Sequence, residues 1–179
     1  MINPDLAVNA WIPSIQLPIF IALAKGIEFL FDTLPLTIIS LAVALVIWLR
    51  KSRKDAAVFA GVMLLNAIAI EAIKLIVHRA RPINGLIQES SYAFPSGHAA
   101  TALVFFGFLI YFAIKYLKPK KQKSITISLC LLMIVLIGFS RIYLNTHWLT
   151  DVLGGFLVGA VMLALSLLTL RILEKNKKS

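Results

Sequence analysis

The sequence predicts an all-α membrane protein, a polytopic bundle of transmembrane helices. Of its 179 residues, 60% are hydrophobic and only 15% are charged, and the mean hydropathy of +0.90 is too high for an ordinary soluble domain. The charges gather in short segments between long apolar stretches. No repeat, low-complexity tract or separate soluble segment divides the chain, so we expect one membrane domain over residues 1–179.

Five apolar stretches predict the spanning helices. A helix that crosses a membrane requires about 20 apolar residues, and that demand is met at roughly 35–49, 56–77, 97–117, 124–141 and 150–173. A sixth segment, from Ile15 to Phe31, is ambiguous. Lys25, Glu28 and Asp32 fall on one side of it, which suits a helix lying in the interface as well as a span packed on its neighbours.

The basic residues predict the orientation. Thirteen of the 18 lysines and arginines fall in three clusters, at residues 50–54, 115–123 and 171–178. With five spans, all three clusters lie on one side, which the positive-inside rule makes cytoplasmic. The net charge of +10 is therefore a topology signal. Nucleic acid is not expected as a partner, because short loops leave little surface for a duplex.

A second polar group is predicted on the opposite, extracytoplasmic side. It belongs to three segments that reach the same membrane depth, so side chains distant in sequence can build a single site there. Its basic and histidine members are Lys74, His78, Arg79, Arg81, His98, Arg141 and His147.

The first segment, KLIVHRARP, offers two cations. Lys74 and Arg81 are two helical turns apart and are predicted to share a helix face, with Pro82 ending the helix. A lysine and the planar fork of an arginine suit a group with several negative oxygens. Two alternatives stay open: both side chains reach for lipid headgroups, or Glu71 is the partner of Lys74.

The second segment, PSGH, starts an apolar helix. Backbone amides at a helix N-terminus, together with the Ser96 hydroxyl, can cradle an anion, and Gly97 allows it to approach the main chain closely. His98 then projects from the first turn toward whatever the cradle holds. The alternative for these four residues is a plain helix cap.

The third segment, SRIYLNTHWLTD, contains Arg141, His147 and Asp151. If the chain is helical from His147 onward, Asp151 lies one turn away and can accept the Nδ1 proton of the imidazole. Nε2 is then left as a nucleophile. A metal site is the competing interpretation, but the usual cysteine or carboxylate ligands are missing and the nearby cations would repel a metal. We expect neither metal nor cofactor.

Together these residues fit phosphoryl transfer. The cations and the amide cradle bind a phosphate, His147 attacks phosphorus, and His98 protonates the leaving oxygen. A transporter or anion-binding membrane protein is the alternative from another class, since buried cations and histidines also line permeation paths. Charges at a single depth favour the enzyme.

The same residues resemble the three signature motifs of the type 2 phosphatidic acid phosphatase superfamily, which includes bacterial phosphatidylglycerophosphate, undecaprenyl diphosphate and lipid A phosphatases. Every defining position of these patterns is present in the expected order. KxxxxxxRP is matched by Lys74, Arg81 and Pro82; PSGH by residues 95–98; and SRxxxxxHxxxD by Ser140, Arg141, His147 and Asp151.

The resemblance implies a six-helix fold in which the segment 15–31 spans the membrane and the N-terminus is cytoplasmic. It also implies a phosphohistidine at His147 supported by Asp151, with His98 as acid and then base, and no metal. The expected partner is a membrane lipid phosphate in a bacterial or archaeal cell membrane. The lipid, transfer to an acceptor other than water, and the oligomeric state are left open. The link from Ile83 to Phe94 is too short for a large cap over the site.

Two features of the spans are predicted to serve packing. Gly155 and Gly159 form a GxxxG pattern that allows another helix to approach closely. Asn66, in the middle of a span, is predicted to form a hydrogen bond between helices.

Overall fold

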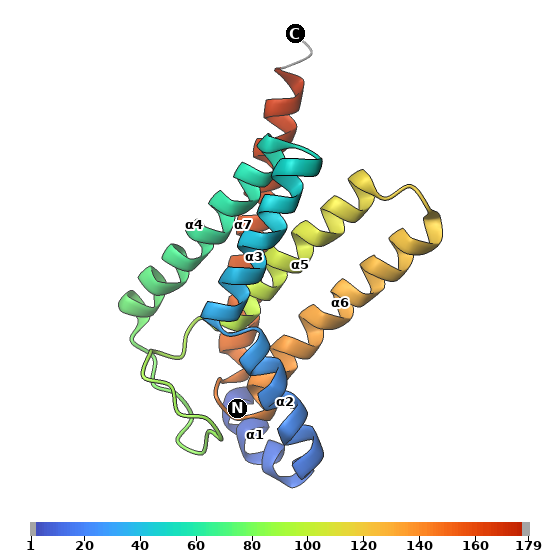
Figure 1. The fold of residues 1–179 in the computed structure, drawn as a ribbon. Helices are drawn as coiled ribbons and strands as arrows, with labels where there is room; N and C mark the ends of the chain where they lie inside the picture. The colour runs from blue at the N-terminus through green and yellow to red at the C-terminus, as the bar shows by residue number, and fades with distance from the viewer. Residues whose placement is uncertain (1–2, 177–179) are drawn as a thin grey trace.

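Five long helices form the body of the molecule. In the computed structural model, which describes residues 3–176, the helices are α1 (Pro4–Trp11), α2 (Pro18–Leu30), α3 (Thr33–Arg50), α4 (Arg53–Val77), α5 (Gly97–Tyr116), α6 (Lys120–Tyr143) and α7 (Leu149–Lys175), with a 3-10 turn over Ile12–Ile15 (Figure 1). Helices α3 to α7 are long and apolar enough to cross a membrane. The prediction of an all-α bundle with five spans is confirmed.

The sixth predicted span does not form in the described chain. The segment 15–31 gives α2, which has 13 residues and is only about 20 Å long, whereas the apolar core of a bilayer is about 30 Å thick. The helix begins at Pro18 and ends at Leu30, and Asp32, the N-cap of α3, follows after a single residue, Phe31. The helix is thus too short to be a span by itself, which agrees with the interfacial alternative that the sequence left open.

The two ends of the bundle differ in composition. Helices α1 and α2 and the long loop 78–96 lie at one end, together with the N-termini of α5 and α7 (Figure 1). At the other end lie the α3–α4 turn, the α5–α6 turn and the C-terminal end of α7. These segments contain the first two basic clusters and the described part of the third, residues 171–176. The expected separation of the basic clusters from the histidine-bearing segments is confirmed.

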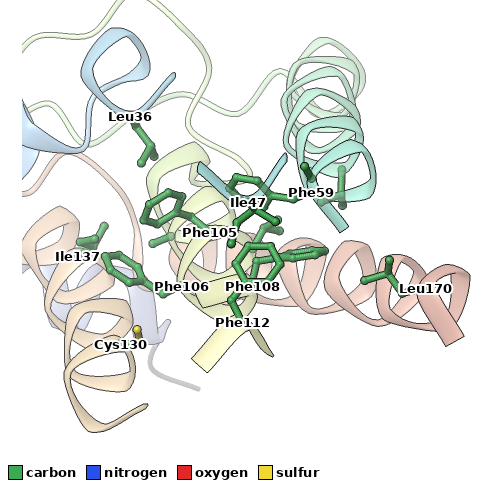
Figure 2. Close-up of a cluster of buried hydrophobic side chains, with 14 residues drawn as sticks. Leu36, Ile47, Phe59, Phe105, Phe106, Phe108, Phe112, Cys130, Ile137 and Leu170 are labelled. Carbon is green, nitrogen blue, oxygen red and sulfur yellow. The ribbon is translucent and has the colours of Figure 1, made fainter. Parts of the chain in front are cut away.

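Helix α5 is the centre of the bundle. In its most apolar stretch 50% of the residues are buried, whereas the corresponding share is at most 28% in the other four spans. Its phenylalanines pack with Phe59 of α4 (Figure 2). Helix α7 lies so close to α5 that a Cβ on Gly159 would stand 2.6 Å from the carbonyl oxygen of Ala100. The predicted packing role of the GxxxG pattern is confirmed, and this contact fixes α5 against α7.

Polar contacts also position the helices that carry the site. Asn66 of α4 donates from Nδ2 to Oγ1 of Thr101 on α5 at 3.1 Å, as predicted. Helix α4 ends at Val77, five residues before Pro82, because His78 adopts a left-handed conformation and its N–H bonds the carbonyl of Lys74. Arg81 consequently lies in the loop and does not share a helix face with Lys74, which corrects that prediction.

Candidate active site

An open groove of about 680 Å³ leads into the polar end of the bundle. Apolar residues of α3 and α4 line its length, including Leu36, Leu41 and Ala67. Its polar end brings together side chains from all three motifs, namely Lys74, Arg81, Gly97, His98 and His147. The sequence therefore predicted correctly that these distant segments meet at one place.

His147 and Asp151 lie beside each other, as the third motif predicted, but the predicted hydrogen bond between them is not formed, because Nδ1 of His147 has no hydrogen-bond partner among the described residues. Nδ1 of His147 lies 3.5 Å from Oδ2 of Asp151, and both side chains are buried. The helical path assumed in that prediction was wrong, because α7 begins only at Leu149. Asp151 reaches back from the first turn of α7 and accepts the N–H of Trp148 at 2.9 Å, and this places its carboxylate beside the imidazole.

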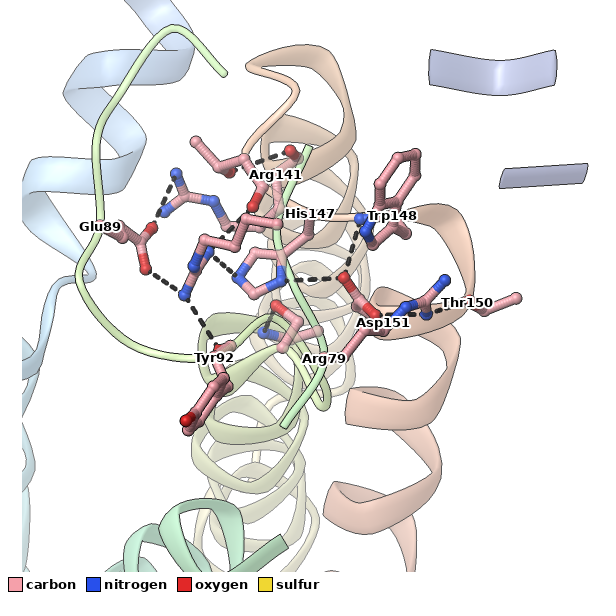
Figure 3. A network of polar contacts seen from close by, with 12 residues as sticks. Arg79, Glu89, Tyr92, Arg141, His147, Trp148, Thr150 and Asp151 are labelled. Carbon is pink, nitrogen blue, oxygen red and sulfur yellow. Dashed lines mark hydrogen bonds and ion pairs between the residues drawn. The ribbon is translucent and has the colours of Figure 1, made fainter. Parts of the chain in front are cut away.

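The opposite nitrogen of His147 faces a guanidinium group. Nε2 lies 3.0 Å from Nη1 of Arg81, which also donates to the carbonyl of Thr146 at 2.9 Å (Figure 3). Burial lowers the pKa of His147 below its usual value; the contact with Asp151 opposes this effect and the charge of Arg81 adds to it. The lowered pKa favours the neutral ring, in which the lone pair on Nε2 is directed at Nη1 of Arg81.

Ser91 in the loop joins the two cations of the first motif. Its Oγ accepts from Nζ of Lys74 at 3.3 Å and from Nη2 of Arg81 at 3.1 Å. Lys74 also pairs with Glu71 at 2.9 Å, the alternative partner that the sequence indicated. Although Arg81 is not helical, the loop returns it to the same pocket as Lys74.

Arg141 is buried without neutralising hydrogen bonds. Its side chain is fully buried, and none of its three guanidinium nitrogens has a hydrogen-bond partner among the described residues. The two nearest carboxylates are those of Glu28 on α2, at 3.9 Å, and Glu89 in the loop, at 4.0 Å. A buried guanidinium is costly to leave without hydrogen bonds. The side chain does not line the groove, and its role in binding phosphate stays a prediction.

Glu89 occupies the space between two arginines. One carboxylate oxygen lies 2.6 Å from Arg81 and the other lies 4.0 Å from Arg141 (Figure 3). Sequence reasoning missed this residue. Its signal was that it is the single acidic residue in the polar link 78–96 between the two cation-bearing motifs.

The PSGH segment gives its residues different positions. Ser96 is the N-cap of α5, and its Oγ accepts from the N–H of Ala99 at 3.4 Å, which is the capping alternative. Gly97 and His98 line the groove, and Nε2 of His98 is buried with no hydrogen-bond partner in the described chain. The phosphate-binding role of Ser96 stays a prediction.

The expected absence of metal also stays a prediction. Within residues 3–176, no three histidine, cysteine or acidic side chains gather closely enough to hold a metal ion. The guanidinium, ammonium and imidazole groups that converge suit an anionic ligand, although the carboxylates of Glu71 and Glu89 pair with two of these cations in this structure.

A five-span bundle in which Arg81, His98 and His147 meet at the end of an apolar groove defines an integral membrane protein with a cationic pocket suited to an amphiphilic anion. Residues 55–175 match the model of the PAP2 superfamily, and the chain belongs to that family. Phosphatidylglycerophosphatase B of Bacillus subtilis (strain 168) is 39% identical over 107 residues, which are 59% of this chain and 51% of that protein. Lipid phosphate phosphatase delta of Arabidopsis thaliana is 30% identical over 79 residues, 41% of this chain and 18% of that protein.

Solved structures extend the similarity to the whole fold. The crystal structure of a transmembrane PAP2 type phosphatidylglycerolphosphate phosphatase from Bacillus subtilis superposes with a TM-score of 0.78 at 32% identity and covers 90% of this chain and 82% of that one. LpxE of Aquifex aeolicus has a TM-score of 0.74 at 19% identity, covering 93% and 96%, and shows the shared fold alone. The chain spans about half the length of the first curated relative.

Proposed function

We propose that this protein is a membrane lipid phosphatase that hydrolyses a terminal phosphate from a lipid phosphate or diphosphate through a phosphohistidine at His147. One observation carries the proposal: the apolar groove between α3 and α4 ends at His147, His98 and the cations of the first motif. A ligand that fits such a groove has an apolar tail and an anionic head. The names of the relatives, which refer to lipid phosphatases, support the same activity.

In the proposed complex, the phosphate takes the place of the carboxylates that contact these cations in the structure. The phosphate oxygens take hydrogen bonds from Arg81, Arg141 and Lys74, and the carboxylate of Glu89 turns away as the phosphate enters between the two arginines. Charge-assisted hydrogen bonds to a planar guanidinium are strong and directional. The first amides of α5, beginning at Gly97, add a partly positive helix end.

The first chemical step forms a phosphohistidine. The lone pair on Nε2 of His147 attacks phosphorus, a nitrogen–phosphorus bond forms, and the bond from phosphorus to the lipid oxygen breaks. His98 gives its proton to that oxygen, which leaves as the lipid alcohol or lipid monophosphate. Asp151, 3.5 Å from Nδ1, stabilises the positive charge that develops on the His147 ring.

The second step returns the enzyme to its starting state. Water attacks the phosphorus and gives a proton to His98, the nitrogen–phosphorus bond breaks, and inorganic phosphate leaves. Arg81 and Arg141 hold the phosphoryl oxygens in both steps, and fixed cations of this kind supply the charge stabilisation that magnesium supplies in many other phosphoryl-transfer enzymes.

The active site faces the extracytoplasmic side in this proposal. The basic clusters at the opposite end of the bundle support that orientation, because lysine and arginine favour the cytoplasmic side of short loops. Phosphatidylglycerophosphate is the first substrate to test, since the names of the curated Bacillus subtilis relative and of the Bacillus subtilis crystal structure both refer to it.

The test is phosphate release by the purified protein in detergent with excess chelator. The substrates are phosphatidylglycerophosphate, phosphatidic acid, undecaprenyl diphosphate and lipid A, and the control is His147→Ala. We expect metal-independent release that is lost in the variant, fastest with phosphatidylglycerophosphate. No release from any lipid by a folded protein, or full activity in His147→Ala, contradicts the proposal. If a glycerol acceptor takes the phosphate in preference to water, the enzyme is a phosphotransferase.

A further inference from the structure

The N-terminal helix touches the back of the catalytic pair. Asp5 of α1 is buried, and its Oδ2 accepts from Nη2 of Arg79 at 2.6 Å. The other terminal nitrogen of Arg79, Nη1, donates to Oδ1 of Asp151, also at 2.6 Å. Because Oδ2 of Asp151 faces His147, four residues form a continuous chain from α1 to the ring that we propose as nucleophile (Figure 3 shows its last three members).

We propose that Asp5 and Arg79 are positioning residues, which fix the orientation and the charge balance of Asp151 and thereby set the reactivity of His147. This inference rests on the proposed function. It goes beyond the sequence motifs, because Arg79 stands at a variable position of KxxxxxxRP and Asp5 lies outside residues 55–175, the region that matches the family model.

Asp5 is held on two sides, as a positioning group requires. It accepts the N–H of Thr150 at 2.9 Å with one oxygen, and the hydroxyl of Thr150 at 2.6 Å with the other. Burial opposes its charged form, but the bonds from Thr150 and Arg79 outweigh that effect and lower the pKa of the carboxyl. An ionised Asp5 therefore adds to the capping of α7, because it accepts the N–H of Thr150, whereas Asp151 of α7 itself accepts the N–H of Trp148.

Further contacts anchor α1 over the site loops. Nδ2 of Asn9 donates to Oδ1 of Asn84 at 3.0 Å, and the carbonyl of Asn9 accepts from Nδ2 of Asn145 at 3.4 Å. Ile12, directly after α1, is fully buried. The helix is thus fastened to both loops that carry catalytic residues, so its aspartate has a fixed position relative to Asp151.

A charge change in this chain has a predictable sign at His147. Arg79 offsets the negative charge of Asp151, so its loss strengthens the field that favours the protonated ring. Asp5 offsets Arg79, so its loss has the opposite effect. The other charged or titratable groups that line the pocket, and the Arg141–Glu28 pair beside it, stay unchanged in both variants; the lining groups are Asp32, Glu71, Lys74, Arg81, Glu89 and His98.

The test is the pH dependence of kcat/KM for phosphate release from phosphatidylglycerophosphate, measured with chelator. Arg79→Gln is expected to lower kcat roughly tenfold or more, because a small displacement of a catalytic group is costly, and to move the acidic limb to higher pH. Asp5→Asn is expected to move the limb to lower pH. Arg79→Lys keeps the charge and loses the fork, so we expect a lowered kcat with the limb at its wild-type position.

Glu174→Gln is the matched control. Glu174 also pairs with a cation, Lys115, but at the far end of the bundle, so its loss is expected to leave the limb unchanged. If the acidic limb of the kcat/KM profile lies at the wild-type pH in both Arg79→Gln and Asp5→Asn, this inference is overturned. That holds even if both kcat and stability are lowered. Should Arg79→Gln fail to fold, the sign of the Asp5→Asn shift decides. Activity that survives His147→Ala overturns the proposed function itself, and this inference with it.

Discussion

The two ends of the bundle both bury charged groups, but they satisfy them differently. At the basic end, Lys115 of α5 contacts Asp55 of α4 at 2.7 Å and Glu174 of α7 at 2.6 Å, and Tyr111 accepts a further hydrogen bond from it. At the groove end, the guanidinium of Arg141 and Nε2 of His98 are buried with no hydrogen-bond partner among residues 3–176.

The difference separates structural from functional polar groups. A buried charge costs free energy unless hydrogen bonds compensate it, and the network around Lys115 is compensated within the chain. The guanidinium of Arg141 and Nε2 of His98 lack such hydrogen bonds among the described residues, as expected if the proposed anionic ligand supplies them. The following predictions perturb one end at a time and are ordered by the size of the expected effect.

The largest effect is expected from His147→Ala. Removal of the nucleophile is expected to lower kcat by more than about a thousandfold, while the melting temperature changes little, because the site is not arranged for stability. Phosphate release and thermal unfolding in the same detergent measure the two quantities. A variant that retains a tenth of wild-type activity contradicts the assignment.

Arg81→Lys is expected to lower kcat/KM by roughly ten- to a hundredfold, since a charged hydrogen bond is worth about 1.5–3 kcal/mol and lysine cannot offer the planar fork. Steady-state kinetics measure this loss. The matched change at the other end is Lys115→Arg, for which we expect nearly wild-type kinetics. Equal rates for both variants would mean that Arg81 serves only as an interfacial anchor.

A bulky residue in the groove is expected to discriminate between substrates. Ala67 lines the groove on α4, and Ala67→Phe is expected to lower kcat/KM for a long-chain lipid phosphate about tenfold without affecting a short, water-soluble phosphate ester. Ala160→Phe, at an exposed site on α7, is the control. Equal losses on both substrates indicate that the groove does not hold the lipid tail.

Asp55→Asn tests the compensated end. Asp55 is buried and contacts Lys115 and the hydroxyl of Tyr116, so the variant is expected to lower the free energy of unfolding by about 2 kcal/mol. We expect kcat/KM to stay within about twofold of the wild type. A large loss of activity in a folded variant would show that the two ends are coupled.

The smallest effect concerns pH. Burial lowers the pKa of His147 from its ordinary value of 6.5, and the ring attacks only when it is deprotonated. A lowered pKa keeps the ring deprotonated in more acidic solution, so the acidic limb of the kcat/KM profile is expected below pH 6.5. A limb above that value contradicts a desolvated His147.

Much of the fold and of the site could be predicted from the sequence, because apolar length and motif spacing are local signals. The five spans and the convergence of Lys74, Arg81, His98 and His147 needed no more than these. The path of the loop 78–96 was not predictable, since the left-handed turn at His78 ends α4 early and no proline or glycine marks that position. Asp5 was missed because its link to Asp151 runs through Arg79, which lies 74 residues away from Asp5 in the sequence.

The measurement that tests the central claim most directly is the isolation of a phosphorylated His147. A phosphate ester with an aryl leaving group requires no proton for departure, so His98→Ala is expected to form the intermediate and to hydrolyse it slowly. A rapid denaturing quench of a reaction run in excess chelator, followed by peptide mass spectrometry under non-acidic conditions, locates the phosphoryl group. The account predicts an acid-labile phosphate on His147 that is missing in the His98→Ala, His147→Ala double variant. Turnover of the ester by the wild type with no phosphate on His147 in the trapped protein contradicts it.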